Sequence, residues 1–261
     1  MSSRPAAIEA LVKDPATSGL VLDFDGVLSP IVEDPTESRM PDRVGAVLTR
    51  LAGALGLLAV ISGRPVDFLA QRVRVPGLQL LGSYGIERIR DGARWIDPHA
   101  EEWLGPVRNA SRTLRDLLAG SPGVRVEEKP VSVAVHWRQA PDRDIAAEEV
   151  RRVTAQVAAD TGLRIEPGKL VEEVRPPVDM DKGAAIRALL AESALKTAAY
   201  AGDDLGDIPA LRAVRGAGGY ALVVDHGAET AAELLAIADQ TFAGTEQFAD
   251  WLAELADAMN A

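Results

Sequence analysis

The chain has 261 residues, a formal net charge of −11 at pH 7, and 47% hydrophobic residues. This size and composition predict a soluble globular protein with one large domain, or with a core that carries a smaller inserted domain. The negative charge argues against nucleic acid or an anionic membrane as a partner. The sequence has no cysteine, which excludes a disulfide framework, a thiolate zinc site and a cysteine nucleophile.

The same features predict where the protein works. The first 19 residues contain no apolar signal segment, and no apolar run approaches the roughly 20 residues needed to cross a bilayer. The absence of cysteine fits a reducing compartment. We therefore expect a cytoplasmic protein that has no membrane partner.

Strand-like and helix-like segments alternate along the first part of the chain. Residues 20–24 form an apolar run closed by a glycine turn, which is typical of a buried parallel strand. The pattern continues with an expected helix over 41–55, a strand over 55–61, a helix over 66–73 and a strand over 78–87. Residues 87–96 predict a hairpin with Asp91 and Gly92 at its turn. This alternation predicts an α/β fold with a doubly wound, mostly parallel sheet.

The middle of the chain has a different pattern. An amphipathic helix is expected over 101–118, a hairpin over 123–138 with its turn at 128–130, a helix over 144–161, and a second hairpin over 162–176 with its turn at 167–168. The order αββαββ predicts an antiparallel sheet with two helices on one face. We therefore expect an α+β cap domain over 103–174, inserted into a catalytic core formed by 1–102 and 175–261.

The last third returns to the α/β pattern. Helices are expected over 181–193, 205–214 and 245–259, and strands over 198–204 and 219–225. Polar residues mark the ends of these elements, namely Asp23 and Asp25, Ser62, Lys182, and Asp203 and Asp204 with Asp207 one turn further on. Ligands of open α/β sheets collect beyond the carboxyl ends of the strands. We therefore expect these acids, the hydroxyl and the ammonium group to converge there.

Such a cluster has a clear chemical use. Two carboxylates about 4 Å apart repel by about 4 kcal/mol at an effective dielectric of about 20. A hard divalent cation removes that cost, and Mg²⁺ takes oxygen ligands together with a substrate phosphate. With Lys182 and Ser62 the cluster makes a phosphate site, in which Asp23 suits a nucleophile that forms an aspartyl-phosphate. Asp25, on the turn, is placed to protonate the leaving group and then to deprotonate the attacking water.

Each element alone has an ordinary structural explanation. The first aspartate pair fits turn chemistry equally well, and Ser62 alone is better explained as a helix N-cap. Lys182 alone suits a solvated helix position, and the last aspartate pair suits a helix N-terminus. The joint pattern, in order and at element ends, favours the phosphate site. The three histidines, His99, His136 and His226, are scattered, which argues against a histidine metal site.

The motifs "DFDG", "SGR", "DKG" and "GDDLGD" resemble those of the haloacid-dehalogenase-like phosphatases. A narrower resemblance, to the trehalose-6-phosphate phosphatase family, runs from "LDFDGVLSPIVEDP" through "VEEKPVSVAVHWR" and "PGKLVEEVRPPVDMDKGAAI" to "AGDDLGDIPAL". The chain departs from the family pattern at Val27, where threonine is usual, and at Tyr84, where histidine is common. It also has "GDDLGDIPAL" where "GDDxTDEDAF" is more frequent.

The resemblance implies a role for each matching residue. The nucleophile falls on Asp23, the acid and base on Asp25, and the phosphate contacts on Ser62 and Lys182. The metal ligands fall on Asp23, on Asp25 through its carbonyl, and on Asp203, and we expect Asp204 and Asp207 to complete the metal site. The sugar contacts of the cap fall on Glu127, Lys129 and Glu173.

Alternation along the cap hairpin adds further candidates. Ser132, His136 and Arg138 share the polar face that would look at the substrate. On the residues alone, Glu127 and Lys129 are better explained as a solvated hairpin tip with a surface ion pair worth ~0–1 kcal/mol, and the resemblance reverses that judgement. Alternation does not choose between Glu172 and Glu173. Arg64, Arg138 and Lys169 could offset the net charge around an anion but are equally consistent with ordinary surface.

The expected function is Mg²⁺-dependent hydrolysis of trehalose 6-phosphate to trehalose and phosphate, the last step of trehalose biosynthesis. The resemblance places it after a trehalose-6-phosphate synthase. One alternative is a phosphatase of the same fold for sucrose 6-phosphate or mannosyl-3-phosphoglycerate. Another is a catalytically silent sugar-phosphate-binding module, which the intact Asp23, Asp25, Lys182 and Asp203 argue against.

Overall fold

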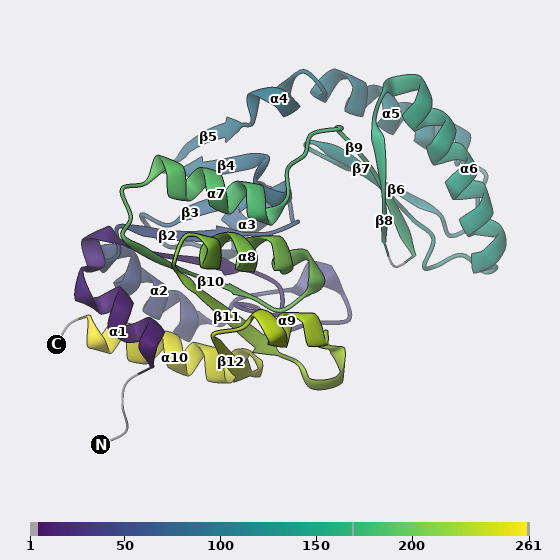
Figure 1. The fold of residues 1–261 in the computed structure, drawn as a ribbon. Helices are drawn as coiled ribbons and strands as arrows, with labels where there is room; N and C mark the ends of the chain where they lie inside the picture. The colour runs from purple at the N-terminus through teal and green to yellow at the C-terminus, as the bar shows by residue number, and fades with distance from the viewer. Residues whose placement is uncertain (1–4, 169, 260–261) are drawn as a thin grey trace. The chain divides into compact units, whose positions relative to one another are not determined.

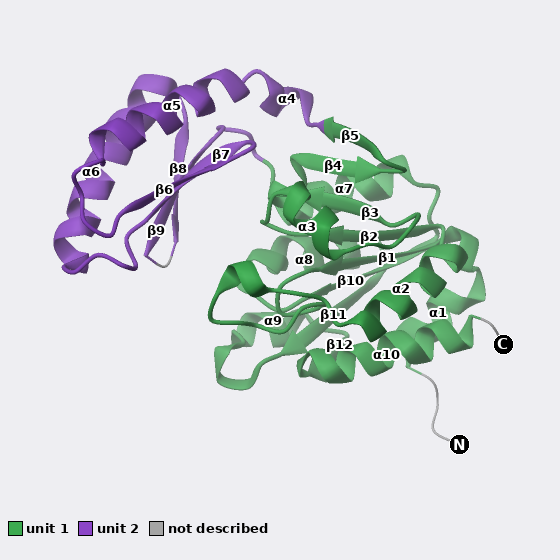
Figure 2. Ribbon diagram, turned by 180° about the vertical axis from the view of Figure 1, so that it is seen from behind, with its two compact units in different colours: residues 1–95, 180–261 green, residues 96–179 purple. Residues whose placement is uncertain are grey.

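The computed structural model describes residues 5–168 and 170–259 and divides into two compact units. The core unit is Met1–Trp95 with Met180–Ala261, and the cap unit is Ile96–Asp179 (Figure 2). Each unit has its own sheet, with two apolar clusters in the core unit and one in the cap unit. Within the described ranges, none of the helices combines the length and the apolar character that a membrane span requires.

An eight-stranded sheet with the order β12-β11-β10-β1-β2-β3-β4-β5 forms the centre of the core unit. Its strands are β1 Ser18–Asp23, β2 Leu57–Ile61, β3 Gln79–Gly82, β4 Glu87–Arg90, β5 Ala93–Ile96, β10 Thr197–Gly202, β11 Tyr220–Asp225 and β12 Gln240–Ala243. The pairs from β12 to β3 are parallel, and β3 pairs antiparallel with β4. The chain winds outward from β1 in both directions, which confirms the predicted doubly wound α/β core.

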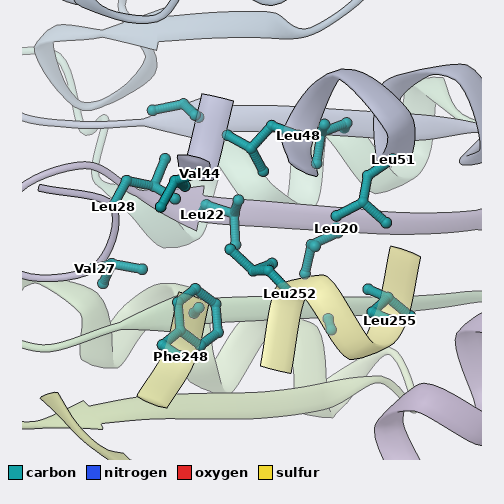
Figure 3. Close-up of a cluster of buried hydrophobic side chains, with 14 of the residues drawn as sticks. Leu20, Leu22, Val27, Leu28, Val44, Leu48, Leu51, Phe248, Leu252 and Leu255 are labelled. Carbon is teal, nitrogen blue, oxygen red and sulfur yellow. The ribbon is translucent and has the colours of Figure 1, made fainter. Parts of the chain in front are cut away.

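Helices cover both faces of this sheet (Figure 1). Buried side chains of α1 Ala6–Lys13, α2 Asp42–Ala54, α3 Val66–Arg72 and α10 Gly244–Ala258 form one apolar cluster with the strands. Those of α7 Lys182–Glu192, α8 Ile208–Gly216 and α9 Ala232–Ile237 form the other. Strand β1 is buried along its whole length, with Leu20 and Leu22 in the first cluster and Val21 in the second. Figure 3 shows Leu20 and Leu22 between side chains of α2 and α10.

The cap unit is a four-stranded antiparallel sheet with the order β6-β7-β9-β8. Its elements are α4 Pro98–Glu101, α5 Leu104–Leu117, β6 Arg125–Lys129, β7 Ser132–His136, α6 Arg143–Thr161, β8 Arg164–Gly168 and β9 Val171–Arg175. The helices α5 and α6 cover one face of the sheet (Figure 2), where Val133 and Val135 of β7 pack with Leu114 and Val150. This arrangement confirms the αββαββ cap.

Three boundaries in the cap differ from the expectation. The helix predicted over 101–118 is divided into α4 and α5. The first hairpin turns at Pro130 and Val131, because Lys129 still pairs with Ser132. The second hairpin turns after Gly168, which pairs with Val171. Pro167 remains in the ladder because β8 is an edge strand, where a residue without an N–H group is tolerated.

Candidate active site

Asp23 is the last residue of β1 and is only 4% exposed. The ammonium Nζ of Lys182 lies 2.9 Å from its Oδ2 atom. Its Oδ1 atom is buried and has no hydrogen-bond partner among the described residues. A buried polar atom without a partner is costly, so its place at the end of a strand indicates a chemical use. Both a bound cation and an attacked phosphorus atom would use this oxygen.

Lys182 begins α7 and is also only 4% exposed. Its ammonium group lies 2.7 Å from Oδ1 of Asp207 and thus joins two carboxylates. Helices α7 and α8 pack closely because residue 183 is glycine: a Cβ there would come within 2.7 Å of Pro209. Burial alone would lower the pKa of Lys182, but the charges of Asp207 and Asp23 outweigh it and raise that pKa well above its usual range.

Asp207 is fully buried and holds the loop after β10 in place. Its carboxylate accepts hydrogen bonds from Lys182, from the Tyr200 hydroxyl, and from the backbone N–H groups of Asp203 and Asp204 at 2.9 and 3.2 Å. Burial opposes the charged form, but Lys182 and the hydrogen bonds lower the pKa of Asp207. Asp204 in turn caps the 3₁₀ turn Leu205–Asp207. Both oxygens of Asp207 are therefore occupied, and it serves better to position the loop than to bind a ligand.

Asp203 lies beside the turn that follows β1. Gly26 has a φ angle of +75°, and a Cβ there would stand 1.9 Å from Oδ2 of Asp203. Carboxylate oxygens of Asp23, Asp203 and Asp207 lie within 4.8 Å of one another. Burial raises the pKa of Asp23 well above its usual range, and burial with the charges of Asp207 and Asp204 raises that of Asp203 to about 8. Three carboxylates that share one ammonium group, Lys182, carry excess negative charge, and such an oxygen-only group fits a hard cation such as Mg²⁺.

Asp25 lies two residues beyond Asp23, and its carboxylate has a separate set of partners. Arg64 donates two hydrogen bonds to it, from Nε at 2.8 Å and from Nη2 at 3.1 Å. Ser38 donates a third from its hydroxyl at 2.6 Å. Ser62, buried at the end of β2, accepts a hydrogen bond from the backbone N–H of Arg64 at 3.1 Å. The structure therefore brings together Asp23, Asp25, Ser62, Arg64 and Lys182 along one edge of the sheet.

Three further residues belong to this edge, and sequence reasoning gave none of them a role. The hydroxyl of Tyr200 bonds Asp207, although its strand reads as a plain apolar run. His226, in the loop after β11, lies 2.9 Å through Nε2 from the Gly26 carbonyl oxygen. Ser38 comes from the long loop before α2. His226 carries the one available signal, since it follows the end of a parallel strand as the aspartates do.

The cap candidates lie mostly on one face of their own sheet. Glu127 of β6 and Glu173 of β9 are both opposite Ala134 of β7, so the three residues form one row across the strands. His136 Nε2 lies 2.8 Å from Oε2 of Glu127. The hydrogen bond from His136, with the charges of Lys129 and Arg125, lowers the pKa of Glu127 to about 2. This face therefore presents an ionised carboxylate.

Glu173 has partners of its own within the row. Lys129 Nζ lies 2.9 Å from Oε2 of Glu173, and the Ser132 hydroxyl bonds Oε1. Glu172 points the opposite way, is buried, and accepts a hydrogen bond from Thr154 of α6. Alternation alone left this choice open. Arg138 is exposed in the turn after β7, away from the regular strand, and Lys169 lies outside the described residues.

The fold is shared with solved structures of haloacid-dehalogenase-like hydrolases. A structure titled as a haloacid dehalogenase-like hydrolase from Bacteroides thetaiotaomicron covers 91% of this chain and 99% of its own at a TM-score of 0.63 and 15% identity. A structure titled as a trehalose-6-phosphate phosphatase related protein covers 92% of this chain and 97% of its own at a TM-score of 0.77 and 22% identity. At these identities the likeness shows the fold.

Sequence comparison shows the family. The family model described as trehalose-phosphatase matches residues 21–234, and the chain belongs to this family. A trehalose-phosphate phosphatase of Mycobacterium avium is 37% identical over 97% of this chain and 68% of its own length. One of Mycobacterium marinum is 36% identical over 87% of this chain and 60% of its own length. These findings confirm the family expected from the motifs, while the match spans only part of each relative.

Proposed function

We propose that this protein is a Mg²⁺-dependent phosphatase that hydrolyses trehalose 6-phosphate to trehalose and phosphate. The observation that supports this proposal most directly is that Oδ1 of Asp23 is buried and has no hydrogen-bond partner within the part of the chain that the structure describes, while Oδ2 pairs with Lys182, in a chain that belongs to the trehalose-phosphatase family. The names of the curated relatives support the sugar phosphate as substrate. In this proposal a trehalose-6-phosphate synthase supplies the substrate, and the reaction takes place in the cytoplasm.

The chemistry begins at Asp23. Its free Oδ1 attacks the phosphorus atom, the bond from phosphorus to the sugar oxygen breaks, and Asp25 gives its proton to that leaving oxygen. Asp25 then takes a proton from a water molecule that attacks the phosphorylated Asp23, which releases phosphate and restores the carboxylate. Ser62 and Lys182 bind the phosphate oxygens. The buried Lys182, 2.9 Å from the other carboxylate oxygen, favours the ionised form of Asp23 against the burial that raises its pKa.

The donor set of the core supports Mg²⁺ as the cofactor. Asp23 and Asp203 through their carboxylates, and Asp25 through its backbone carbonyl, would hold the ion. All three are oxygen donors, and two of them carry raised pKa values that a cation would relieve. When bound, the ion neutralises charge on the acids and on the transferred phosphoryl group. Asp204 and Asp207 shape the loop that presents Asp203.

The cap supplies selection of the sugar in this proposal. A disaccharide offers many hydroxyl groups, and carboxylates are strong acceptors for them. Glu127 and Glu173 present such acceptors, while Lys129 and His136 donate to them and hold them in one row. Arg64 and Arg138 stand as further contacts to the anionic substrate. In this proposal, residues of the core therefore carry out the hydrolysis, and residues of the cap select the sugar.

A panel of substrates tests the function. Phosphate release is measured with trehalose 6-phosphate, sucrose 6-phosphate and mannosyl-3-phosphoglycerate, each with and without Mg²⁺. We expect trehalose 6-phosphate to give the highest kcat/KM and chelation of Mg²⁺ to abolish turnover. A higher kcat/KM for sucrose 6-phosphate or mannosyl-3-phosphoglycerate would make that compound the preferred substrate of the protein. Binding of a sugar phosphate without any release of phosphate would indicate a catalytically silent sugar-phosphate-binding module.

A further inference from the structure

Ser38 contacts the candidate active site, although it lies outside the four sequence motifs that predicted the site. It lies in the loop between β1 and α2, directly after the 3₁₀ turn Pro35–Glu37, and is 1% exposed. Its hydroxyl donates to Oδ1 of Asp25 at 2.6 Å. Asp25 itself is only partly covered, with 38% of its side chain exposed. A fully buried donor thus holds one oxygen of a carboxylate that is otherwise bound by Arg64 and partly exposed.

A second buried hydroxyl stands behind Ser38. The Oγ atoms of Ser29 and Ser38 lie 2.7 Å apart, and Ser29 is 0% exposed. A serine hydroxyl has one proton, and an ionised carboxylate only accepts. Because Ser38 gives its proton to Asp25, Ser29 must be the donor in the contact between the serines. Ser29, Ser38 and Asp25 therefore form a directed hydrogen-bond chain, in which each donation strengthens the next.

Helix α3 holds the Ser38 loop in place. Arg72, at the end of α3, donates through Nε to the Ser38 carbonyl at 2.9 Å and through Nη2 to the Thr36 carbonyl at 2.8 Å. The guanidinium groups of both Arg72 and Arg64 stack on the ring of Phe68, at 3.6 and 4.5 Å from its centroid. Arg64 also donates to Asp25. The loop, the helix and the Asp25 carboxylate thus form a closed set of contacts.

We propose that Ser38 is a positioning residue that holds the Asp25 carboxyl group in one orientation through both of its proton transfers. The inference rests on the proposed function, in which Asp25 protonates the leaving sugar oxygen and later deprotonates water. A hydroxyl suits this task because it both donates and accepts. It donates to the Asp25 carboxylate. Ser38 keeps donating to Oδ1 when Asp25 carries a proton, so that proton is held on Oδ2, away from the serines, where it can be given to the leaving oxygen.

Two substrates with different leaving groups isolate this role. A sugar alkoxide leaves poorly and needs a proton from Asp25, whereas p-nitrophenolate is stable and leaves without one. The value of kcat/KM reports the step in which the first bond breaks. A residue that only maintains the fold would change both substrates alike. A residue that orients the acid would change the sugar phosphate alone.

The variants are S38A, S38T, S29A and a matched control, T36A. Thr36 lies in the same loop, and its exposed hydroxyl bonds Asp34 rather than Asp25. S38A is expected to lower kcat/KM about tenfold with the sugar phosphate, a fraction of the 10²- to 10⁴-fold effect of a general acid, and less than about twofold with p-nitrophenyl phosphate. S38T restores most of the loss. T36A leaves both substrates unchanged.

The outcomes separate this inference from the proposed function. The sugar phosphate used is whichever one the wild type hydrolyses best, so a wrong substrate assignment leaves the comparison intact. S29A keeps Ser38 and is expected to lower kcat/KM less than S38A does, again with the sugar phosphate and not with p-nitrophenyl phosphate. This variant tests the same role if S38A fails to fold. Equal losses on both substrates, or a T36A profile that matches S38A, would overturn the role of Ser38. A wild type that releases phosphate from no sugar phosphate would overturn both.

Discussion

The ammonium group of Lys182 lies 2.9 Å from Oδ2 of Asp23, although the two residues come from the two separate core segments on either side of the cap. Both side chains are almost completely buried. A charge this deep is stable only with a partner, so the pair joins the first strand to the first helix after the cap. This ion pair therefore joins the two core segments that the cap separates.

Replacing Lys182 with methionine removes the positive partner of two buried carboxylates. Removing one member of a buried pair costs about 3–5 kcal/mol, so K182M should lower the free energy of unfolding by that order and abolish turnover. The matched control is K196M, since Lys196 forms an exposed pair with Asp14 and such pairs contribute ~0–1 kcal/mol. Chemical denaturation measures both. Similar losses in the two variants would contradict the burial argument.

A side chain at position 26 should disable the site without unfolding the protein. Gly26 adopts a positive φ angle, and a Cβ there would collide with the carboxylate of Asp203. We expect G26A to lose at least about tenfold in kcat/KM, since small displacements of catalytic groups are costly. The control is G92A, where φ is also positive but a Cβ would meet nothing within 4 Å. If G26A and G92A behave alike, the close approach of the turn to Asp203 has no functional meaning.

Replacing Glu127, in the row of cap residues on β6, β7 and β9, should weaken binding of the sugar without slowing hydrolysis of the phosphate ester. E127A is expected to raise KM for trehalose 6-phosphate several-fold while leaving hydrolysis of p-nitrophenyl phosphate near normal. The adjacent Glu128 bonds Ser111 and Arg115 of α5, and E128A is therefore the matched control. Steady-state kinetics on both substrates decide the matter. Equal losses on the two substrates in E127A would argue against a sugar contact.

Acid should remove the stabilisation that Glu127 gives to the cap. Its pKa is about 2 in the folded protein and near 4.5 when unfolded, so the ionised group stabilises the fold above about pH 4.5. That contribution decreases as the pH falls towards 2. The difference in free energy of unfolding between wild type and E127Q should be constant above pH 5 and should close below it. A difference that is unchanged down to pH 3 would contradict the depressed pKa.

The sequence predicted the strands that are buried on both faces. Strand β1 is a continuous apolar run, and such runs identify central parallel strands. The edge strand β12, with only Phe242 buried, has no such run and was not expected. The short helices α1 and α9 were also not expected. They pack an apolar side against the core, and tertiary contacts rather than periodicity determine helices of this length.

The residues of the candidate site also fall into two groups, those that the sequence pattern predicts and those that it does not. Asp23 ends β1, Lys182 begins α7 and Asp207 ends the 3₁₀ turn after β10, so their convergence follows from the topology of a parallel sheet. Ser38 and Tyr200 do not. The contact of Ser38 depends on the path of an irregular loop, and that of Tyr200 on a hydroxyl at the end of an apolar side chain. Loop paths and terminal atoms carry no periodic signal, so only the structure reveals these partners.

The role of Asp23 is tested most directly by phosphate release from trehalose 6-phosphate with wild type and D23N in the presence of Mg²⁺. Circular dichroism serves to confirm that both are folded. We predict Mg²⁺-dependent release by the wild type and none above background by folded D23N, because the amide oxygen is a far weaker nucleophile than the carboxylate. Near-normal release by D23N would contradict the assignment of Asp23 as the nucleophile.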